Sequence, residues 1–584
     1  MKAFDIRRRE GAAEGPGWPV HVHPVLRRVY AQRGITDPRE IEHRLGALAA
    51  PDLLQNIGTA CDLLEDAILR ERHITVVGDF DCDGATGTAV AVRGLRMLGA
   101  RRVDFRVPNR LLHGYGLGPA LVASLEPAPD LIVTVDNGIA SHAGVAAARE
   151  RGIDVLITDH HLPAATLPPA QAIVNPLLAP VSGGAQTPAA GPSPLRHLCG
   201  VGVVFCLLVA LRARLRARAA FAAGAEPDLS ALLDLVALGT VADLVPLDFN
   251  NRVLVEAGLR RIRARRACAG VLALLEVAGR DPAEVVAADL GYVVGPRINA
   301  AGRLDDMALG IACLLSDDAG EARELAGRLS AINAERRDLQ ATMVEQGEAA
   351  IAGWIERHGG EALPFGVTLF EDDWHAGVVG LVASKLKERL HRPVIACAPA
   401  GDGSDEVRGS ARSIRGIHVR DLLAEVDARC PGLIRRFGGH AMAAGLSLGR
   451  ADVARFAAEF DAVVRARSAR ELFDPVLLSD GELEAGDIGL ELARQLRTAG
   501  PWGQGFPEPL FDNDFELDSW RVVGGRHWRL DLRMPGQAGT IEAILFNADA
   551  GSAPPKRFRA AYQLDINQWN GRERVQLVLR HLCP

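Results

Sequence analysis

The stretch HITVVGDFDCDG, residues 73–84, decides the fold of this chain. A short β-branched run ends here on three alternating aspartates and a glycine. Two later runs end in the same way: LIVTV at 131–135 meets Asp136, and VLIT at 155–158 meets Asp159-His160-His161. Helix-like, Ala-rich sequence separates the runs. Strands that alternate with helices in this way are typical of a parallel α/β sheet.

Acidic and histidine side chains follow each predicted strand. Because the carboxyl ends of parallel strands line up along one edge of a sheet, we expect these side chains to converge there. The set is Asp79, Asp81, Asp83, Asp136, Asp159, His160 and His161. So many carboxylates would raise one another's pKa values unless cations neutralised them. The sequence therefore predicts two divalent metal ions with oxygen and imidazole ligands, an arrangement that favours phosphoester hydrolysis.

Each motif taken singly has an alternative interpretation. Aspartates at a strand end often only cap the next helix, which would explain 79–84. Asp136 could bind a ribose in a dinucleotide fold, but no GxGxxG follows the first strand. The histidine pair is more specific, since only one of His160 and His161 could point into a core. One could bind metal while the other faces a phosphate. Asp243 ends a long apolar run, and is either a further ligand or an N-cap.

Composition places these motifs in a large globular protein. A chain of 584 residues is too long for one core, and about three domains are expected. The nine cysteines form no CxxC pair, which favours a reducing cytoplasm over a disulfide framework or a structural zinc site. We expect no membrane contact, since no apolar stretch approaches the ~20 residues of a bilayer span. The net charge of −7 argues against a generally basic nucleic-acid coat.

The sequence pattern divides the chain into five segments. Residues 1–55 are expected to form a helical lead-in, and 56–317 contain the strands described above. Residues 318–358 predict either a long helix of about 60 Å that separates two lobes or one member of a helical bundle. A smaller α/β unit follows at 359–467. Alternating strands over 468–584 predict a β-barrel of the OB type, whose aromatics and basic groove suit a single strand.

Several motifs together resemble a known family. They are short and spread over nearly the whole chain: DFDCDG (79–84), PNR (108–110), HGYG (113–116), VDNG (135–138), DHH (159–161), GTVAD (239–243), GPRINAAGRLD (295–305), WHAGVVG (374–380) and GGHAMAAG (438–445). The first six are similar to those of the DHH phosphoesterases, and the last three narrow the resemblance to the RecJ family within them. The resemblance implies a DHH domain, a long connecting helix, a DHHA1 domain and a C-terminal OB-fold-like domain.

The resemblance also implies an activity. RecJ-type enzymes are single-stranded-DNA-specific exonucleases that release 5′-mononucleotides in the 5′→3′ direction, with Mn²⁺ or Mg²⁺, in recombinational and mismatch repair. Single-strand-binding protein and a RecQ-type helicase would be partners, and we expect a monomer. Two alternatives are a DHH phosphodiesterase of short oligonucleotides, whose relatives are typically smaller, and a non-catalytic DNA-binding scaffold, which would tend to lose the acids and histidines kept here.

Residue roles follow from the resemblance position by position. The expected metal ligands are Asp79, Asp81, Asp83, Asp136, His160 and Asp243, with Asp136 as a bridge. His161 falls where the family contacts the scissile phosphate. The expected 5′-phosphate-binding residues are Arg110, Ser410 and Arg412. The expected DNA path comprises Arg297, Asn299, Arg303, His375, Gly438, Gly439 and His440. Trp528 and Trp569 are the barrel aromatics expected to stack on bases, although most aromatics of a small barrel are core.

Overall fold

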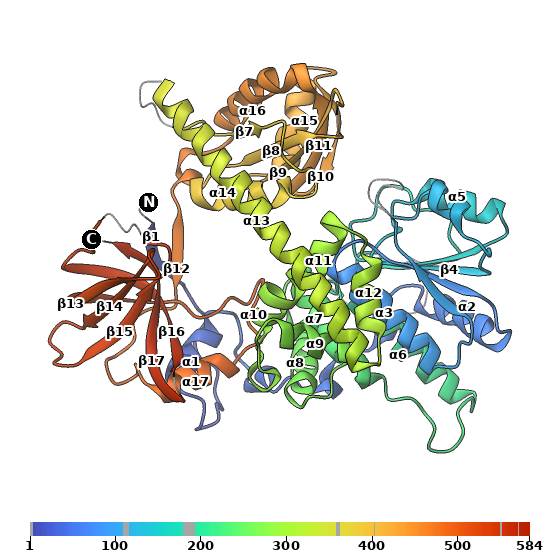
Figure 1. Cartoon of the computed structure of the whole chain (residues 1–584). Helices are drawn as coiled ribbons and strands as arrows, with labels where there is room; N and C mark the ends of the chain where they lie inside the picture. The colour runs from blue at the N-terminus through green and yellow to red at the C-terminus, as the bar shows by residue number, and fades with distance from the viewer. Residues whose placement is uncertain are drawn as a thin grey trace.

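The molecule consists of two α/β lobes and a β-barrel (Figure 1). The computed structural model describes residues 4–108, 116–178, 193–357, 363–401, 403–548, 552–569 and 571–583, with the side chains of Arg357 and Trp569 excepted. The long yellow-green helix α13 runs from the first lobe to the second, and the barrel lies to one side with both chain ends close to it. Within the described ranges, none of the helices combines the length and apolar character needed to span a bilayer.

The first lobe contains a five-stranded parallel sheet, which confirms the expected fold class. In spatial order its strands are β3 (Val103–Arg106), β2 (Ile74–Val77), β4 (Leu131–Val135), β5 (Asp154–Thr158) and β6 (Ala172–Val174). All residues of β2 and β4 are buried, as expected for central strands covered by helices on both faces. The helices of this sheet region are α2 (Ile57–Leu69), α3 (Cys82–Met97), α4 (Pro119–Ser124), α5 (His142–Glu150) and α6 (Gly200–Ala217).

A helical half completes this lobe and carries Asp243 to the sheet. Apart from Asp234 and Thr240, helix α7 (Leu233–Ala242) is apolar on every side, and it packs against α3 and α8, because such a helix is stable only when it is buried all round. The remaining elements are α8 (Phe249–Arg263), α9 (Ala269–Val277), α10 (Ala287–Asp289), the π-helical turn η6 (Leu290–Val294), α11 (Gly295–Leu304) and α12 (Ala308–Leu315).

Helix α13 (Ala319–Arg357) is the long helix expected over 318–358. Its 39 residues take part in two cores. Ala322 and Leu329 are buried in the core of the first lobe, whereas Met343 and Ile351 are buried in that of the second. Its first half also packs against α9, α11 and α12, so the bundle and connector interpretations both describe part of it.

The second lobe has a mixed five-stranded sheet, and the barrel is closed. The sheet order is β10 (Ile434–Gly439), β11 (Ala443–Gly449), β9 (Glu406–Arg412), β8 (Val394–Pro399) and β7 (Val367–Phe370), with helices α14 (Val379–Leu390), α15 (Val419–Arg429) and α16 (Val453–Arg467).

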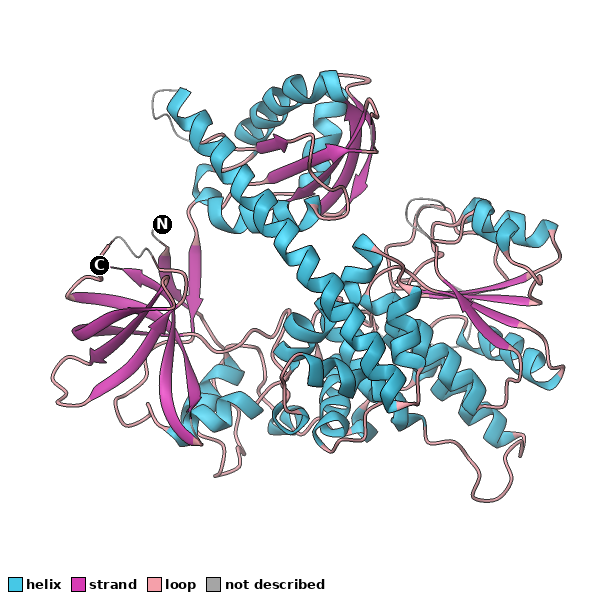
Figure 2. Ribbon diagram, in the orientation of Figure 1, coloured by secondary structure: helices cyan, strands magenta, loops and turns pink. Residues whose placement is uncertain are grey.

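The barrel order is β13 (Phe511–Val523), β14 (His527–Arg533), β15 (Thr540–Leu545), β17 (Arg572–Cys583) and β16 (Arg557–Trp569), preceded by α17 (Leu490–Thr498). Figure 2 shows the contrast between this strand-rich barrel and the helical first lobe.

The N-terminal segment differs from the helical lead-in expected over 1–55. It begins with a strand, β1 (Asp5–Arg8), which pairs in parallel with β12 (Val476–Ser479) beside the barrel, and helix α1 (Pro24–Ala31) follows. Buried Asp480 accepts hydrogen bonds from Arg33 at 2.9 and 3.0 Å. The prediction missed β1 because a strand of four residues depends on a partner more than 460 residues away.

Candidate metal centre and nucleic-acid path

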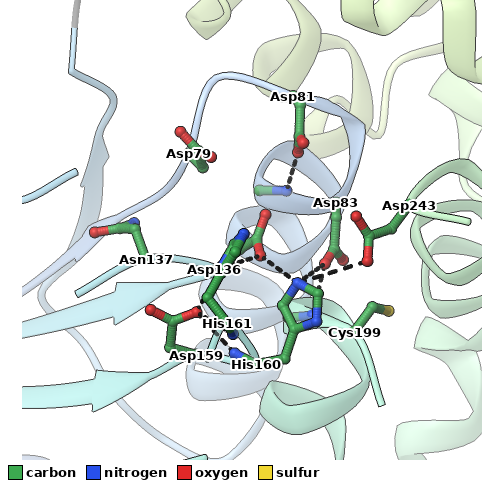
Figure 3. Close-up of polar contacts among 12 residues, drawn as sticks. Asp79, Asp81, Asp83, Asp136, Asn137, Asp159, His160, His161, Cys199 and Asp243 are labelled. Carbon is green, nitrogen blue, oxygen red and sulfur yellow. Dashed lines mark hydrogen bonds and ion pairs between the residues drawn. The ribbon is translucent and has the colours of Figure 1, made fainter. Parts of the chain in front are cut away.

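The acids and histidines of the motifs meet at one edge of the parallel sheet (Figure 3). Strands β2, β4 and β5 are adjacent and in register, so the residues that follow Val77, Val135 and Thr158 lie side by side. The six expected metal ligands and His161 form three overlapping groups, in each of which one ligand atom per residue lies within 4.8 Å of the others. The groups are Asp79, Asp81 and Asp136; Asp83, His160 and Asp243; and Asp136, His160 and His161.

The loop after β2 is held in shape by its own carboxylates. Asp81 is the N-cap of α3, and its Oδ1 accepts a hydrogen bond from the N–H of Gly84 at 3.0 Å. The capping interpretation therefore accounts for one oxygen of Asp81. A Cβ at Gly84 would lie 2.6 Å from the backbone of Asp79, so only glycine lets the chain turn this closely.

Helix α6 supports the next carboxylate. Asp83 is buried, and it accepts hydrogen bonds from the backbone N–H groups of Gly200 at 2.6 Å and Val201 at 2.9 Å. These donors form the N-terminus of α6, where the helix dipole favours an anion. Gly200 also lies against Asp136, because a Cβ there would be 2.5 Å from the Asp136 Cβ.

Asp136 and His160 point at a common position. Asp136 is 1% exposed and has a left-handed φ of +62°, which turns its carboxylate away from the line of β4. His160 Nε2 lies 3.1 Å from Asp136 Oδ1, 3.5 Å from Asp243 Oδ2 and 3.9 Å from Asp83 Oδ2. Asp136 Oδ1, His160 Nε2 and Asp243 Oδ2 are all buried, and none makes a well-directed hydrogen bond within the described chain. Buried polar atoms without such bonds are rare, and their convergence fits a metal ion.

Asp243 reaches the candidate metal centre from the C-terminal end of α7, where a negative charge is unfavourable. It is the C-cap of α7, so the N-cap alternative is wrong. A carboxylate at the C-terminus of a helix meets the negative end of the helix dipole. Burial and three neighbouring aspartates raise its pKa well above the usual range. A nearby cation would offset all of these effects.

The other carboxylates show the same excess of negative charge. Burial, followed by the charge of Asp81, raises the pKa of Asp79 to about 8 and that of Asp83 to about 7. Burial and the neighbouring aspartates also raise the pKa of Asp136 well above its usual range. Burial lowers the pKa of His160 to about 4, so its imidazole is neutral and able to bind metal. This donor set of carboxylates and a neutral imidazole fits Mn²⁺ or Mg²⁺.

Asp159 has a different role from that of the other aspartates. Its Oδ1 accepts hydrogen bonds from the His161 N–H at 3.0 Å and from His161 Nδ1 at 2.8 Å, and its Oδ2 accepts one from Ile139 at 2.9 Å. Burial would lower the pKa of His161, but the hydrogen bond and charge of Asp159 outweigh it and raise the pKa to about 9. His161 is thus a cation oriented by Asp159, a relation that the sequence pattern did not reveal.

Two of the three expected phosphate-binding residues lie together in the second lobe. Ser410 and Arg412 are on β9, and Arg412 Nη1 donates to Ser410 Oγ at 2.9 Å. Both side chains face the first turn of α14, where a Cβ at Gly380 would lie 2.9 Å from Arg412 Nη2 and 3.0 Å from Ser410 Oγ. Burial lowers the pKa of Arg412. The third expected residue, Arg110, lies outside the described residues.

Three of the residues expected along the DNA path make hydrogen bonds within or between the two lobes. Asn299 Oδ1 accepts a hydrogen bond from the Cys82 N–H at 2.8 Å, so this side chain holds the metal-binding loop. Arg303 Nη1 donates to the carbonyl of Gly377 at 3.2 Å, across the boundary between the lobes. His375 Nδ1 accepts from the Gly377 N–H at 3.1 Å, which shapes the same loop. All three side chains therefore have structural contacts in addition to any role in binding.

The glycine-rich segment at the end of β10 and in the turn before β11 contains Gly438, Gly439 and His440 of the expected DNA path. A Cβ at Gly438 would meet nothing within 4 Å, whereas Gly439 has a φ of +141° and packs against Ala443 and Ala444. Burial and then the positive charge of His161 lower the pKa of His440. His440, on the second lobe, is therefore within electrostatic range of His161 at the candidate metal centre.

The barrel aromatics require a correction. Trp528 is only 6% exposed, so its ring belongs to the barrel core and cannot stack on a base. The alternation of Trp528, Leu530 and Leu532, all buried on β14, is a signal that could have shown this. The exposed barrel aromatics among the described residues are Trp520, at 37%, and Phe546, at 50%. The side chain of Trp569 lies outside the described part of the chain.

Three family models match successive parts of the chain. The DHH family N-terminal domain matches residues 73–240, the DHHA1 domain matches 363–466, and the RecJ OB domain matches 479–581. These ranges coincide with the parallel-sheet region, the second lobe and the barrel.

Similar proteins share the whole architecture. The single-stranded-DNA-specific exonuclease RecJ of Salmonella typhimurium is 47% identical over 590 residues, 99% of each chain. The protein of the same name from Dickeya dadantii is 48% identical over 591 residues, 100% of each chain. A crystal structure of RecJ in complex with Mn²⁺ from Thermus thermophilus is 32% identical with a TM-score of 0.78, covering 99% of this chain and 80% of that chain. A second structure from that organism is in complex with Mg²⁺, with a TM-score of 0.73.

Proposed function

We infer, from the premise that this chain belongs to the RecJ family of single-stranded-DNA-specific exonucleases, that it hydrolyses single-stranded DNA at the metal centre described above. The observation that carries this inference is the convergence of three buried atoms without well-directed hydrogen bonds: Asp136 Oδ1, His160 Nε2 and Asp243 Oδ2. A scaffold that only bound DNA would have no use for such a costly arrangement.

The proposed metal ligands are the six residues expected from the sequence, which contribute to the three donor groups. Two Mn²⁺ or Mg²⁺ ions held there would activate water and neutralise charge on the phosphoryl group. The chain itself contributes the positions of the ligands. The α6 N-terminus fixes Asp83, the left-handed backbone fixes Asp136, and Asn299 fixes the loop that carries Asp81.

His161 is proposed to bind the scissile phosphate. Its pKa of about 9 keeps the ring protonated at neutral pH, and a cation there would form charge-assisted hydrogen bonds with phosphoryl oxygens. Asp159 acts through His161 as a positioning residue, because it occupies Nδ1 and leaves Nε2 to face the substrate.

The polarity of digestion is proposed to follow from the second lobe. Ser410, Arg412 and the first turn of α14 would form a cradle for a terminal phosphate, and the missing Cβ of Gly380 lets the Arg412 and Ser410 side chains pack against that turn. A strand held there by its 5′ phosphate would present its first linkage to the metal centre. The products would be 5′-mononucleotides released in the 5′→3′ direction.

The remaining strand is proposed to run between the lobes toward the barrel. His375, Gly438, Gly439 and His440 would line one wall, and Arg297 and Arg303 the other. Among the barrel aromatics with described side chains, Trp520 and Phe546 are exposed enough to stack on bases. Trp528 is excluded from this role by its burial.

The cellular setting is a further part of the proposal. All nine cysteines are free, which supports a reducing cytoplasm. We propose a role in recombinational and mismatch repair, with single-strand-binding protein and a RecQ-type helicase as partners and a monomer as the active form. Co-purification with either partner and light scattering of the free enzyme would test these points.

The decisive experiment is digestion of a long 5′-phosphorylated single strand labelled at either end, with and without Mn²⁺. We expect mononucleotides from the 5′ end, only with metal, and none from the Asp136→Asn variant. Release from short oligonucleotides alone would favour a short-oligonucleotide phosphodiesterase. If wild type and Asp136→Asn both bound the strand tightly and released no nucleotides, the result would favour a DNA-binding scaffold and refute the proposed nuclease activity.

A further inference from the structure

A positively charged pocket lies between helix α11, helix α13 and the second lobe. Its volume is about 380 Å³, and it is lined by five arginines: Arg280, Arg297, Arg303, Arg336 and Arg337. Among the described residues, no acidic side chain lines it, although Arg280 forms an ion pair with Asp289 at 3.3 Å. The pocket therefore has a strong excess of positive charge.

The charge of Arg297 is poorly compensated within the described chain, whereas Arg336 donates to the uncharged side chains of Asn333 at 2.6 Å and Gln340 at 2.7 Å. Arg297 Nη1 donates to the carbonyl of Val293 at 2.6 Å, but its buried Nε has no hydrogen-bond partner within the described ranges. Burial, and then the charges of Arg337 and Arg280, lower the pKa of Arg297. Burial and Arg337 do the same for Arg336. An anion with several acceptor oxygens, such as a phosphodiester, would relieve both the repulsion and the missing bond.

The pocket is one helix away from the candidate metal centre. Asn299, which lines it, accepts the hydrogen bond from Cys82 in the metal-binding loop. Helix α11 touches that loop again at Gly302, where a Cβ would lie 1.9 Å from the carbonyl oxygen of Phe80. Leu381 lines the pocket from the second lobe, next to Gly380 of the phosphate cradle. A strand that passes the metal centre thus has this pocket within reach.

An exposed aromatic ring stands at the pocket. Tyr292 lines it and is 81% exposed, the largest exposed fraction of any Phe, Tyr or Trp side chain among the described residues. It is part of the π-helical turn η6, and such turns inside helical segments often mark functional positions. A ring that projects into solvent beside several guanidinium groups is suited to stack on a base whose phosphate they bind.

We propose that Tyr292 and the arginine pocket form a subsite for one nucleotide of the single strand, with the phosphate in the pocket and the base stacked on the Tyr292 ring. Any base would fit, since every base offers a π face, and this tolerance suits an enzyme that digests a strand regardless of sequence. The inference rests on the proposed function, because it requires a single strand at the metal centre.

The test uses Mg²⁺-loaded full-length enzyme and 5′-phosphorylated strands whose first linkages are phosphorothioates, which resist hydrolysis with this metal and keep the strand in one register. One abasic residue is moved along the strand, and Kd is measured for wild type, Tyr292→Ala and Tyr292→Phe. For the intact strand we expect Tyr292→Ala to raise Kd about 5- to 100-fold and Tyr292→Phe to leave it unchanged. An abasic residue at one position should raise the wild-type Kd by a similar factor and leave the Kd of Tyr292→Ala unaffected.

The contrary results are distinct from one another. Equal Kd values for wild type and Tyr292→Ala would overturn the subsite. The subsite would also be overturned if Tyr292→Ala lost affinity and each abasic residue still weakened its binding as much as it weakens that of wild type. The Tyr292 ring would then support the fold and would not stack on a base. If unmodified strands are digested normally by wild type, either result leaves the proposed function intact. If wild type digests no single strand, the proposed function fails first.

Discussion

Helix α11 separates two regions with opposite electrostatic needs. On one side, buried aspartates raise one another's pKa values around His160, and on the other five arginines surround a pocket. Like charges this close repel strongly where water is scarce. The first region has an excess of negative charge and the second an excess of positive charge. Metal ions would balance the first, and the phosphates of a bound strand would balance the second. The comparison shows that the sign of the excess charge indicates the kind of ligand that each region would bind.

The largest expected effect comes from breaking the acidic region. Asp136→Asn keeps the size of the side chain but removes a charge from two of the three donor groups. We expect kcat/KM for single-stranded DNA to fall about 10³-fold or more, since metal catalysis contributes several kcal/mol. Quantitative nuclease assays measure this. Asp514→Asn, at an exposed barrel position, is the control, and comparable activity of the two variants would refute the assignment.

The second-largest effect should depend on whether the 5′ end of the strand carries a phosphate. Removing the guanidinium in Arg412→Ala should lower kcat/KM about 10- to 100-fold on 5′-phosphorylated strands, because a charged hydrogen bond is worth about 1.5–3 kcal/mol. On 5′-hydroxyl strands the loss should be much smaller. Arg408→Ala, exposed on the same strand, is the matched control. An equal loss on both substrates would mean that Arg412 only supports the lobe.

The third prediction concerns the acidic region alone, and it is that Mn²⁺ stabilises the folded protein more at high pH than at low pH. Because folding raises the pKa of Asp83 to about 7 and that of Asp79 to about 8, the metal-free folded protein binds extra protons. These groups stabilise it fully below about pH 4 and lose that contribution as pH rises toward 8. Mn²⁺ requires ionised carboxylates, so its stabilisation should grow with pH, to about 2.7 kcal/mol at 100 times Kd. Thermal melts with Mn²⁺ or EDTA measure this, and a larger Mn²⁺ effect at pH 5.5 than at pH 8 would contradict it.

The smallest effect concerns the basic region. Arg337→Gln removes one charge from the pocket, so the salt dependence of strand binding should weaken by about 0.7 in log–log slope. The loss of affinity should be the same for every sequence, since phosphate contacts carry no base information. Titrations over a range of salt concentrations measure the slope. Arg328→Gln, exposed on α13 and outside the pocket, should leave it unchanged.

Much of the metal centre could be predicted from the sequence because its geometry is local. Hydrophobic runs that end on Asp79, Asp136 and Asp159 define strand ends, and parallel strands align those ends. The long apolar run before Asp243 had marked it as a ligand candidate, and the family resemblance supported that choice, although this residue arrives from a helix end rather than from the sheet. Asp79, Asp136 and Asp243 meet in the three donor groups of the structure, and their roles as metal ligands are the proposal that the assays test.

The failures have physical causes. Asp159 was assigned no role of its own from the sequence, because its hydrogen bonds to His161 follow from no spacing, and strand β1 was missed because it needs a distant partner. Trp528 was misassigned although the alternation along β14 places it inside the barrel. The exposure of Tyr292 depends on a π-helical turn in a segment that otherwise suggests an ordinary helix.

Helix α13 has a further consequence, because a helix fixes angle as well as length. Its two halves are buried in different lobes, so one inserted residue between them would rotate the second lobe by about 100° and advance it by about 1.5 Å. The phosphate cradle would then face away from the metal centre. Seven inserted residues would restore the facing to within about 20° but widen the spacing by about 10.5 Å. Helix α13 therefore sets both the distance between the two lobes and the rotation of one lobe relative to the other.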